Sequence, residues 1–392
     1  MPQFNPNVER LSAPAVPVVL AWAGAYGGAH GPMINMSQAV PGYPPHPDML
    51  RFLAEEAGAR RNAGYGEIEG ERPLREAYAA HAARLYGARI EPENIHVTAG
   101  CNQAFVASVL AVAGPGDAVL AVNPVYFNHE ATLRMLGVGV RTVDASAENA
   151  FLPDPDAIRQ ALAPEIRAVA LVSPNNPTGA VYPPALLRAI FELCRERGIW
   201  LLLDETYRDF LPDTSRAPHD LFGEAGWEDT LIGLYSFSKS FCIPGHRMGA
   251  ITAGRQVVAQ VAKTMDNLQI CAALAPQAAL ARALPVLDAW REANRLAIQP
   301  RGAVLVEAIA ASPGWAVDAI GAYFAYVRHP FAGEDSVSVA ERLARDAGVL
   351  AIPGGFFGPR QEHHIRLAFA NADEATIRLL PERLRGFGGS GA

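Results

Sequence analysis

Lys239 is the residue of this chain most suited to covalent chemistry. It stands in the segment Tyr-Ser-Phe-Ser-Lys-Ser-Phe-Cys-Ile-Pro-Gly-His-Arg, residues 235–247, directly after an apolar run. No acidic residue accompanies it in this segment, so no local carboxylate stabilises the protonated amine. A deprotonated amine attacks carbonyl groups and forms imines. Because Ser236, Ser238 and Arg247 are residue types that bind phosphate, the segment predicts a Schiff-base lysine beside a phosphate site.

Other segments place polar or aromatic side chains just past an apolar run. Each also fits an ordinary structural role: a helix N-cap for a carboxylate, a turn for an Asn beside Pro and Gly, a core position for a tyrosine. Together they offer a carboxylate for a ring nitrogen, hydrogen-bonding groups for a hydroxyl, a stacking face and backbone N–H groups for a phosphate. With Lys239 they match the requirements of pyridoxal phosphate; they are Asp204, Tyr207, Asn176, Tyr126, Gly100 and Cys101.

Short apolar runs between residues 94 and 255 must position these side chains. Amphipathic helical patterns such as Pro184–Arg197 alternate with them, which indicates a mostly parallel sheet covered by helices on both faces. Ligands bind at the carboxyl ends of such strands. The predicted strands are Ile95–Thr98, Ala118–Val122, Val138–Val143, Ala168–Val172, Trp200–Leu203, Leu231–Tyr235 and Met248–Thr252.

The sequence predicts an α/β fold with a large sheet domain and a smaller α+β domain. We expect an N-terminal segment, 1–44, that is irregular and packs on the small domain; a large cofactor-binding domain, 45–285; and a small domain, 286–392. An Ala- and Leu-rich stretch, 276–311, reads as one long helix. Further elements are then expected: strands near 322–328, 349–352 and 365–370, and helices over 337–346 and 374–387.

Composition narrows the class of protein. The net charge of −7 and the lack of a basic cluster argue against a nucleic-acid partner. The four cysteines are far apart and follow no metal-binding spacing, so we expect no metal site, no disulfide framework and a reducing, cytoplasmic location. The N-terminus has no signal-peptide pattern, and no apolar stretch is long and regular enough to span a membrane.

The motifs together resemble the class I/II aminotransferases, which are fold-type I pyridoxal-phosphate enzymes. The resemblance runs from about residue 34 to 370, and its most specific part is Ser-Phe-Ser-Lys-Ser-Phe followed by Pro-Gly-His-Arg-Met-Gly. It implies that Lys239 carries the cofactor as an imine and moves the substrate's α-proton. The other implied roles are phosphate binding by Arg247, Ser236 and the backbone at Gly100 and Cys101, pairing of Asp204 with the ring nitrogen, contacts of Asn176 and Tyr207 with the ring's phenolic oxygen, and stacking of Tyr126 on the ring.

Three further segments carry the resemblance. Ala-Gly-Tyr65-Gly resembles the segment whose tyrosine reaches the phosphate of the neighbouring subunit, which implies a homodimer with shared active sites. His-Ile-Arg366-Leu-Ala-Phe-Ala resembles the strand whose arginine binds the substrate α-carboxylate. Ala39 replaces the family's pocket-lining glycine, and it adds a methyl group near the substrate while leaving a backbone N–H available.

The implied reaction is transfer of an amino group from an amino acid to a 2-oxo acid. Two alternatives stay open at this point. One is another reaction on the same fold, a β-lyase, decarboxylase or α-oxoamine synthase. The other is a non-enzymatic regulator that binds pyridoxal phosphate, which the acidic net charge disfavours. No second cation for a dicarboxylate substrate can be selected from the sequence. Trp22, Tyr26 and Tyr43 fit two alternatives, contact with an aromatic or medium-sized apolar substrate and packing of the small domain.

Overall fold

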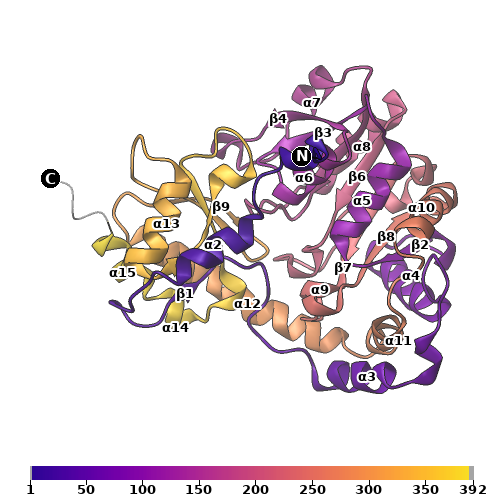
Figure 1. Cartoon of the computed structure of the whole chain (residues 1–392), viewed down its shortest axis with the longest axis horizontal. Helices are drawn as coiled ribbons and strands as arrows, with labels where there is room; N and C mark the ends of the chain where they lie inside the picture. Colours follow the sequence, from indigo (N-terminus) through magenta and orange to yellow (C-terminus); the bar gives the residue numbers. More distant parts are fainter. Residues whose placement is uncertain (1, 388–392) are drawn as a thin grey trace.

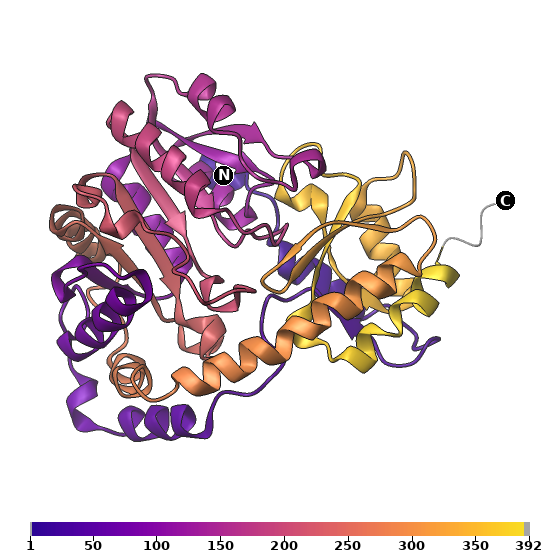
Figure 2. The ribbon, with the colours of Figure 1, turned by 180° about the vertical axis from the view of Figure 1, so that it is seen from behind.

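A seven-stranded sheet forms the centre of the larger part of the molecule. The computed structural model describes residues 2–387, and the sheet stands among helices in the two opposite views of Figures 1 and 2. Its strand order is β2-β8-β7-β6-β5-β3-β4, and only β8 runs against its neighbours. The bounds are β2 Ile95–Thr98, β3 Ala118–Asn123, β4 Gly139–Asp144, β5 Ile166–Val172, β6 Trp200–Asp204, β7 Leu231–Ser236 and β8 Gly249–Ala253.

The strands are apolar on both sides because helices cover both faces of this sheet. In β6, Leu201 and Leu203 join a core with helices α4 (Arg72–Tyr86), α8 (Pro184–Arg197) and α11 (Leu274–Ala283). Leu202, between them, joins the opposite core with α5 (Cys101–Val112) and α10 (Arg255–Leu268). Successive side chains of a strand point to opposite faces, so a run without alternation is what a doubly covered strand requires.

The carboxyl ends of the parallel strands meet at one edge. Thr98, Val172, Asp204 and Ser236 all end strands there. The reversed strand β8 begins at the same edge, where Gly249 pairs with both Thr98 and Ser236. The predicted site segments therefore come together although they are far apart in sequence.

A smaller antiparallel sheet forms the second part of the molecule. Its order is β12-β13-β10-β9, with bounds Ile352–Pro353, His364–Ala368, Phe324–Arg328 and Ala316–Gly321. The short strand β1 (Ile34–Asn35) pairs in parallel with β11 (Val349–Leu350). Helix α12 (Asp288–Ala310) runs from the large part to the small one (Figure 2), and α13 (Ser336–Ala347) packs on the small sheet.

Two expectations about helices are wrong. The single helix over 276–311 is two helices, α11 and α12, because Pro285 cannot donate a helical hydrogen bond. The last helix is also two, α14 (Glu374–Ile377) and α15 (Leu380–Gly386), with Pro381 in the first turn of the second.

The N-terminal segment is not wholly irregular. Ala15–Ala23 forms α2, which packs against α13, and Pro6–Glu9 forms α1, which packs against α6 (Phe127–Met135). Pro17 is compatible with α2 because it lies in the first turn, where N–H groups have no intrahelical partner. Prolines in this segment therefore begin helices as well as interrupt them.

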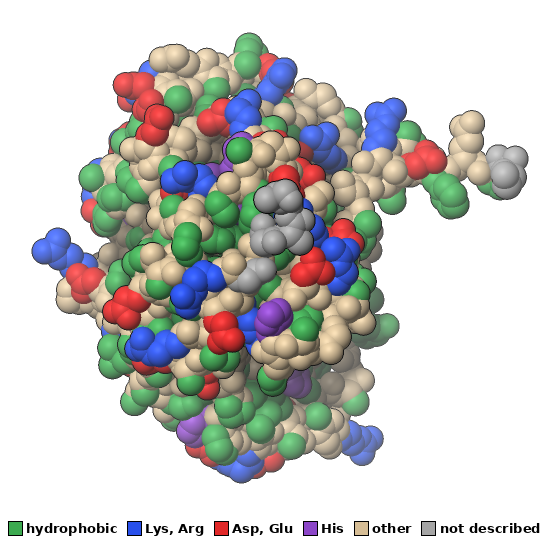
Figure 3. Space-filling view, turned by 90° about the vertical axis from the view of Figure 1, so that its left-hand side faces the viewer, with side chains coloured by type: hydrophobic (Ala, Val, Ile, Leu, Met, Phe, Trp, Pro, Cys, Tyr) green, Lys and Arg blue, Asp and Glu red, His purple; other side chains and the backbone are tan. Residues whose placement is uncertain are grey.

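The surface charges, the hydropathy of the helices and the arrangement of possible metal ligands identify no further site among residues 2–387. Lys, Arg, Asp and Glu side chains are intermixed on the face that Figure 3 shows. Among residues 2–387, no helix has both the length and the apolar character needed to cross a bilayer. In the same range, no cluster of three or more His, Cys, Asp or Glu side chains is arranged to hold a metal ion.

Candidate active site

A cavity opens at the edge of the large sheet where the parallel strands end. Its lining comes from the segments after β2, β3, β5, β6 and β7 and from the approach to β8. Most of the residues predicted to bind cofactor are therefore brought to one place. The lining residues are Cys101, Asn102, Tyr126, Val172, Asn176, Asp204, Thr206, Tyr207, Ser236, Ser238, Lys239, Pro244 and Arg247.

Lys239 lies on α9 (Phe237–Ser240), a single helical turn after β7. Ser236 is the N-cap of this turn, and its hydroxyl accepts a hydrogen bond from the Ser238 N–H at 3.3 Å. Burial, together with the nearby cations Arg366 and Arg247, lowers the pKa of Lys239 to about 8. A larger fraction of this amine is therefore unprotonated near neutral pH than for an ordinary lysine.

Asp204 ends β6 inside the cavity and is 4% exposed. Its Oδ1 accepts from the Thr206 N–H at 2.9 Å, and its Oδ2 lies 3.2 Å from His129 Nε2. Burial alone raises the pKa of a carboxyl group, but the contacts with His129 and Thr206 outweigh it and lower the pKa of Asp204. The structure therefore holds an ionised carboxylate in the wall of the cavity.

His129 is a site residue that the sequence did not reveal. It lies on α6, three residues after Tyr126, and its ring stacks on Phe105 with centroids 3.8 Å apart. The stacking holds the imidazole ring of His129 in place, and its Nε2 atom contacts the Asp204 carboxylate. The only signal in the sequence was a histidine one helical turn beyond a predicted site tyrosine, which alone fits a core position equally well.

Arg366, Asn176 and Tyr207 form a buried polar chain beside the cavity. Asn176 Nδ2 donates to the Tyr207 hydroxyl at 3.4 Å, and Arg366 Nη1 donates to Asn176 Oδ1 at 2.9 Å. Arg366 also donates to the Ser37 carbonyl, and burial lowers its pKa to about 10. Its Nε has no hydrogen-bond partner among the described residues. A buried guanidinium with no carboxylate partner among residues 2–387 is suited to bind a carboxylate ligand.

The other end of the cavity is suited to a phosphate. Gly100 has φ +85°, and a Cβ there would lie 2.2 Å from Arg247 Nη2, so only glycine allows this close approach. Helix α5 begins directly after it, which aims N–H groups outward. Ser238 Oγ is buried without a hydrogen-bond partner within residues 2–387. Because burial raises the pKa of the Cys101 thiol, this side chain stays neutral.

The cavity as a whole fits pyridoxal phosphate. It contains an amine of lowered pKa, a buried carboxylate, a glycine cradle next to an arginine, and an unpartnered hydroxyl. These are the groups that an aldehyde, a pyridine nitrogen and a phosphate need. Ser238 lines the cavity, as the sequence predicted, and so do Thr206 and Asn102, which the sequence did not single out as binding residues.

Four predicted site residues do not line the cavity: Gly100 and Arg366, which lie beside it, and Tyr65 and Ala39. The Tyr65 side chain is 83% exposed and does not reach the cavity of its own chain. Ala39 belongs to the loop after β1, and its carbonyl accepts from the Tyr323 hydroxyl at 3.0 Å. Tyr126 does line the cavity, and its hydroxyl accepts from Asn128 Nδ2 at 2.9 Å.

Comparison with known proteins places the chain in a family. The family described as aminotransferase class I and II matches residues 31–384. Arginine–pyruvate transaminase of Pseudomonas aeruginosa is 33% identical over 316 residues, which are 78% of each chain. Aspartate/prephenate aminotransferase of Thermus thermophilus is 31% identical over 345 residues, 87% of this chain and 88% of that one.

Solved structures agree with the sequence comparison. A double mutant of Thermus thermophilus aspartate aminotransferase superposes with a TM-score of 0.90 at 28% identity, covering 99% of this chain and 100% of that one. N-succinyldiaminopimelate aminotransferase of Mycobacterium tuberculosis gives 0.89 at 28% identity, covering 98% and 100%. The chain thus belongs to the class I and II aminotransferase family and is an aminotransferase.

Proposed function

We propose that this aminotransferase binds pyridoxal phosphate in the cavity at the sheet edge and moves an amino group from an L-amino acid to a 2-oxo acid. The observation that carries the proposal is the convergence of three groups. Lys239, just after β7, and Asp204, at the end of β6, line the cavity, and Arg366 of β13 lies beside it, bonded to the lining residue Asn176. When bound, the cofactor supplies an aldehyde that forms imines and a ring that takes up electrons from the substrate carbon.

Lys239 has two tasks in this proposal. Its unprotonated amine would hold the cofactor through the aldehyde, and when an amino acid takes that place the freed amine would act as the base for the proton on the substrate α-carbon. The pKa of about 8 supports both, because the amine must accept a proton and release it near neutral pH. Asp204, kept ionised by its contacts with His129 and Thr206, would pair with the ring nitrogen and keep it protonated.

Arg366 would orient the substrate. Its guanidinium is 2% exposed and already bonded to Asn176, so it is fixed before a ligand arrives. A planar arginine held this way grips an α-carboxylate through two parallel hydrogen bonds. Asn176 and Tyr207, next in the polar chain, would contact the hydroxyl of the cofactor ring, and Tyr126 would stack on its face.

The proposal includes a homodimer. The exposed phenol of Tyr65 would reach the phosphate in the second copy of this chain, as the family resemblance implies. Leu268 and Ile270 are 52% and 39% exposed and support the proposal of a partly apolar contact surface. We also propose a large domain, 45–285, a small domain, 286–392, an N-terminal segment, 1–44, and a cytoplasmic location. Residues 388–392 lie outside the described part of the chain.

Borohydride reduction of the enzyme with its cofactor tests the proposal directly. The chain has two lysines, Lys239 and Lys263. Lys263 is exposed on α10 and donates to Gln260, so it serves as an internal control. We expect the reduced cofactor on the peptide that contains Lys239. A label on Lys263, or a protein that binds no pyridoxal phosphate, would contradict the proposal.

A further inference from the structure

Tyr65 projects from a loop whose backbone is tightly held. The next residue, Gly66, donates its N–H to Cys271 Sγ at 3.3 Å, and a Cβ there would lie 2.3 Å from Leu274 Cδ2. The loop therefore packs directly on the start of α11, with no room for a side chain at Gly66. An 83% exposed phenol on a fixed backbone is presented to something outside its own chain.

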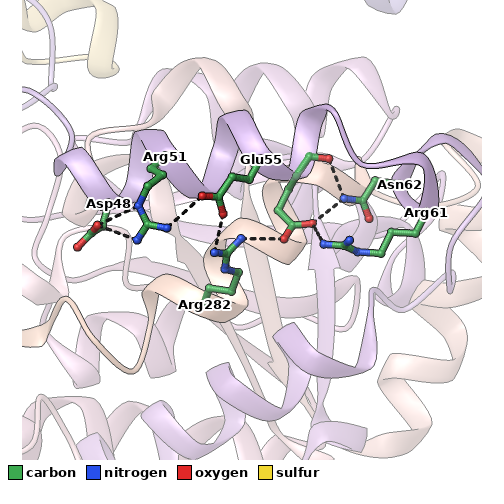
Figure 4. Close-up of polar contacts among 7 residues, drawn as sticks. Asp48, Arg51, Glu55, Arg61, Asn62 and Arg282 are labelled. Atoms are coloured by element: carbon green, nitrogen blue, oxygen red, sulfur yellow. Dashed lines mark hydrogen bonds and ion pairs between the residues drawn. The ribbon is translucent and has the colours of Figure 1, made fainter.

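The other side of the loop is held by a cluster of charges, drawn in Figure 4. Glu56, on α3 (Pro47–Ala57), is 3% exposed and receives three donors: Arg61 Nη2, Asn62 Nδ2 at 2.9 Å and Arg282 Nη1 at 3.0 Å. Asn62 Nδ2 also donates to the Glu56 carbonyl at 2.8 Å. We call these four residues, Glu56, Arg61, Asn62 and Arg282, the Glu56 clasp.

The Glu56 clasp fixes the turn that leads to Tyr65. Arg61 and Asn62 belong to η1 (Arg60–Ala63), which ends two residues before the tyrosine. Arg282 is on α11, the helix that also receives Gly66. Both ends of the Tyr65 loop are thus anchored to α3 and α11, which pack against each other.

Figure 4 also shows ion pairs outside the Glu56 clasp, and these should contribute less to stability than the contacts of the clasp do. Arg51, at the far end of this network, pairs with Asp48 at 2.9 Å and with Glu55 at 3.1 Å, and all three side chains are about half exposed. Such surface pairs contribute little to stability. A nearly buried carboxylate with three donors loses much more when a partner is removed. The exposed pairs of Arg51 therefore serve as a control for substitutions in the Glu56 clasp.

The face that carries Tyr65 also reaches the phosphate end of the cavity. Gln103 Oε1 accepts from the Ala99 N–H at 2.6 Å, next to the Gly100 cradle, and Gln103 Nε2 donates to Gln269 Oε1 at 2.5 Å. Gln269 lies between the exposed Leu268 and Ile270, two residues from the Cys271 that holds Gly66. A two-fold axis through this face would bring Tyr65 of each copy to the phosphate site of the other copy.

We propose that the Glu56 clasp positions a cofactor contact across the dimer: it holds Tyr65 of one copy where it binds the phosphate in the site of the other. The residues of the clasp are positioning residues and touch no substrate. This inference rests on the proposed function, because it requires a phosphate-bearing cofactor and a second copy of the chain.

The first experiment compares the two ends of the network. Asn62→Ala removes the two hydrogen bonds that Asn62 donates to Glu56 and leaves only the Arg61 contact between η1 and Glu56. Arg51→Ala removes two exposed ion pairs and leaves η1 in place. We expect Asn62→Ala and Tyr65→Phe each to weaken pyridoxal phosphate affinity about tenfold, which is what one hydrogen bond to a charged group is worth. Arg51→Ala should leave that affinity unchanged.

Mixed dimers distinguish action across the dimer from an effect within one chain. Two differently tagged copies are purified together, and cofactor affinity is measured at the one site that keeps Lys239. In the first mixed dimer, Asn62→Ala is paired with Lys239→Ala, so the intact clasp faces the working site, and affinity should equal that of the unaltered protein. In the second, the unaltered chain is paired with a copy carrying both changes, and affinity should fall about tenfold.

The outcomes are mutually exclusive. The reverse pattern, or an equal loss in both mixed dimers, overturns the inference. A Tyr65→Phe dimer with unchanged cofactor affinity also overturns it, while borohydride labelling of Lys239 would still support the proposed function. Failure of the unaltered protein to bind pyridoxal phosphate overturns both.

Discussion

Asp204 and Glu205 are neighbours in sequence and almost equally buried, yet they belong to different kinds of site. Asp204 points into the cavity, where it meets His129. Glu205 belongs to the opposite face of the sheet, where Tyr86 donates to it at 2.7 Å and His219 Nε2 lies at 3.2 Å. The two faces alternate along a strand, so adjacent carboxylates enter separate environments.

The Glu205 side is closed by aromatic rings. The Arg208 guanidinium lies 4.0 Å from the Tyr235 ring centroid and donates to the hydroxyls of Tyr86 and Tyr78 at 2.9 and 3.2 Å. Its charge is thus compensated by Glu205 and by ring faces inside the protein. On the cavity side, the Arg366 guanidinium also lies over rings, 5.1 Å from the Phe324 centroid and 5.6 Å from that of Phe357. Within residues 2–387, however, neither Arg366 nor Lys239 forms an ion pair with a carboxylate. The difference separates charges that stabilise the fold from charges that are free to act on a ligand.

Removal of Lys239 should have the largest effect on the cavity side. We expect Lys239→Ala to lower the rate of amino-group transfer by about 10⁴-fold, because both the nucleophile and the base are lost. Turnover is measured with an amino donor and a 2-oxo acid. Lys263→Ala, the matched control at the other lysine, should be as active as the unaltered enzyme. Equal losses of activity in both variants would contradict the role given to Lys239.

Removal of the Asp204 carboxylate should have the next largest effect on the rate of amino-group transfer. Asp204→Ala should lower kcat by about 10²- to 10³-fold, since a fixed charge next to the developing charge is lost. Tyr207→Phe removes one hydroxyl of the polar chain and should cost about tenfold. Steady-state kinetics at saturating cofactor gives the kcat of each variant and so ranks the two losses. The opposite ranking would show that the carboxylate does not act on the ring.

Glu205 should affect stability instead of turnover. Glu205→Ala leaves Arg208 and His219 without their buried partner, and we expect the free energy of unfolding to fall by about 3–5 kcal/mol. Denaturant unfolding measures this loss. The folded fraction of the variant, assayed with cofactor, should keep a kcat within about a factor of three of the unaltered enzyme. A selective loss of kcat with normal stability would remove the distinction between the two carboxylates.

The pH dependence of the cofactor-free protein gives the smallest predicted effect. The pKa of Lys239 is lowered to about 8 in the folded chain, so above that pH the folded state binds fewer protons than the unfolded state. The free energy of unfolding should therefore rise between about pH 8 and the ordinary lysine pKa of roughly 10.4. The burial penalty of the charged amine is fully present below pH 8. Lys239→Met should lack this rise when unfolding is measured across that pH range.

Local pattern predicted the large sheet well. All seven strands were located within one or two residues, because strands covered on both faces give unbroken apolar runs. Helix ends were predicted less well. Pro285 separates α11 from α12, whereas Pro17 lies harmlessly in the first turn of α2. Whether a proline breaks or begins a helix depends on where the chain starts to turn, and neighbouring elements decide that.

The sequence by itself determined the residue types of the site and the strand ends that carry them, since Lys239, Asp204 and Asn176 each follow their own apolar run. Only the tertiary structure decided which partners they meet. His129 reaches Asp204 from α6, which packs against α5 and β4, and Arg366 reaches Asn176 across 190 residues of chain. Tyr65 stays outside its own cavity because the Glu56 clasp and Gly66 fix its loop. Such contacts depend on strand order and helix packing, which no local pattern contains.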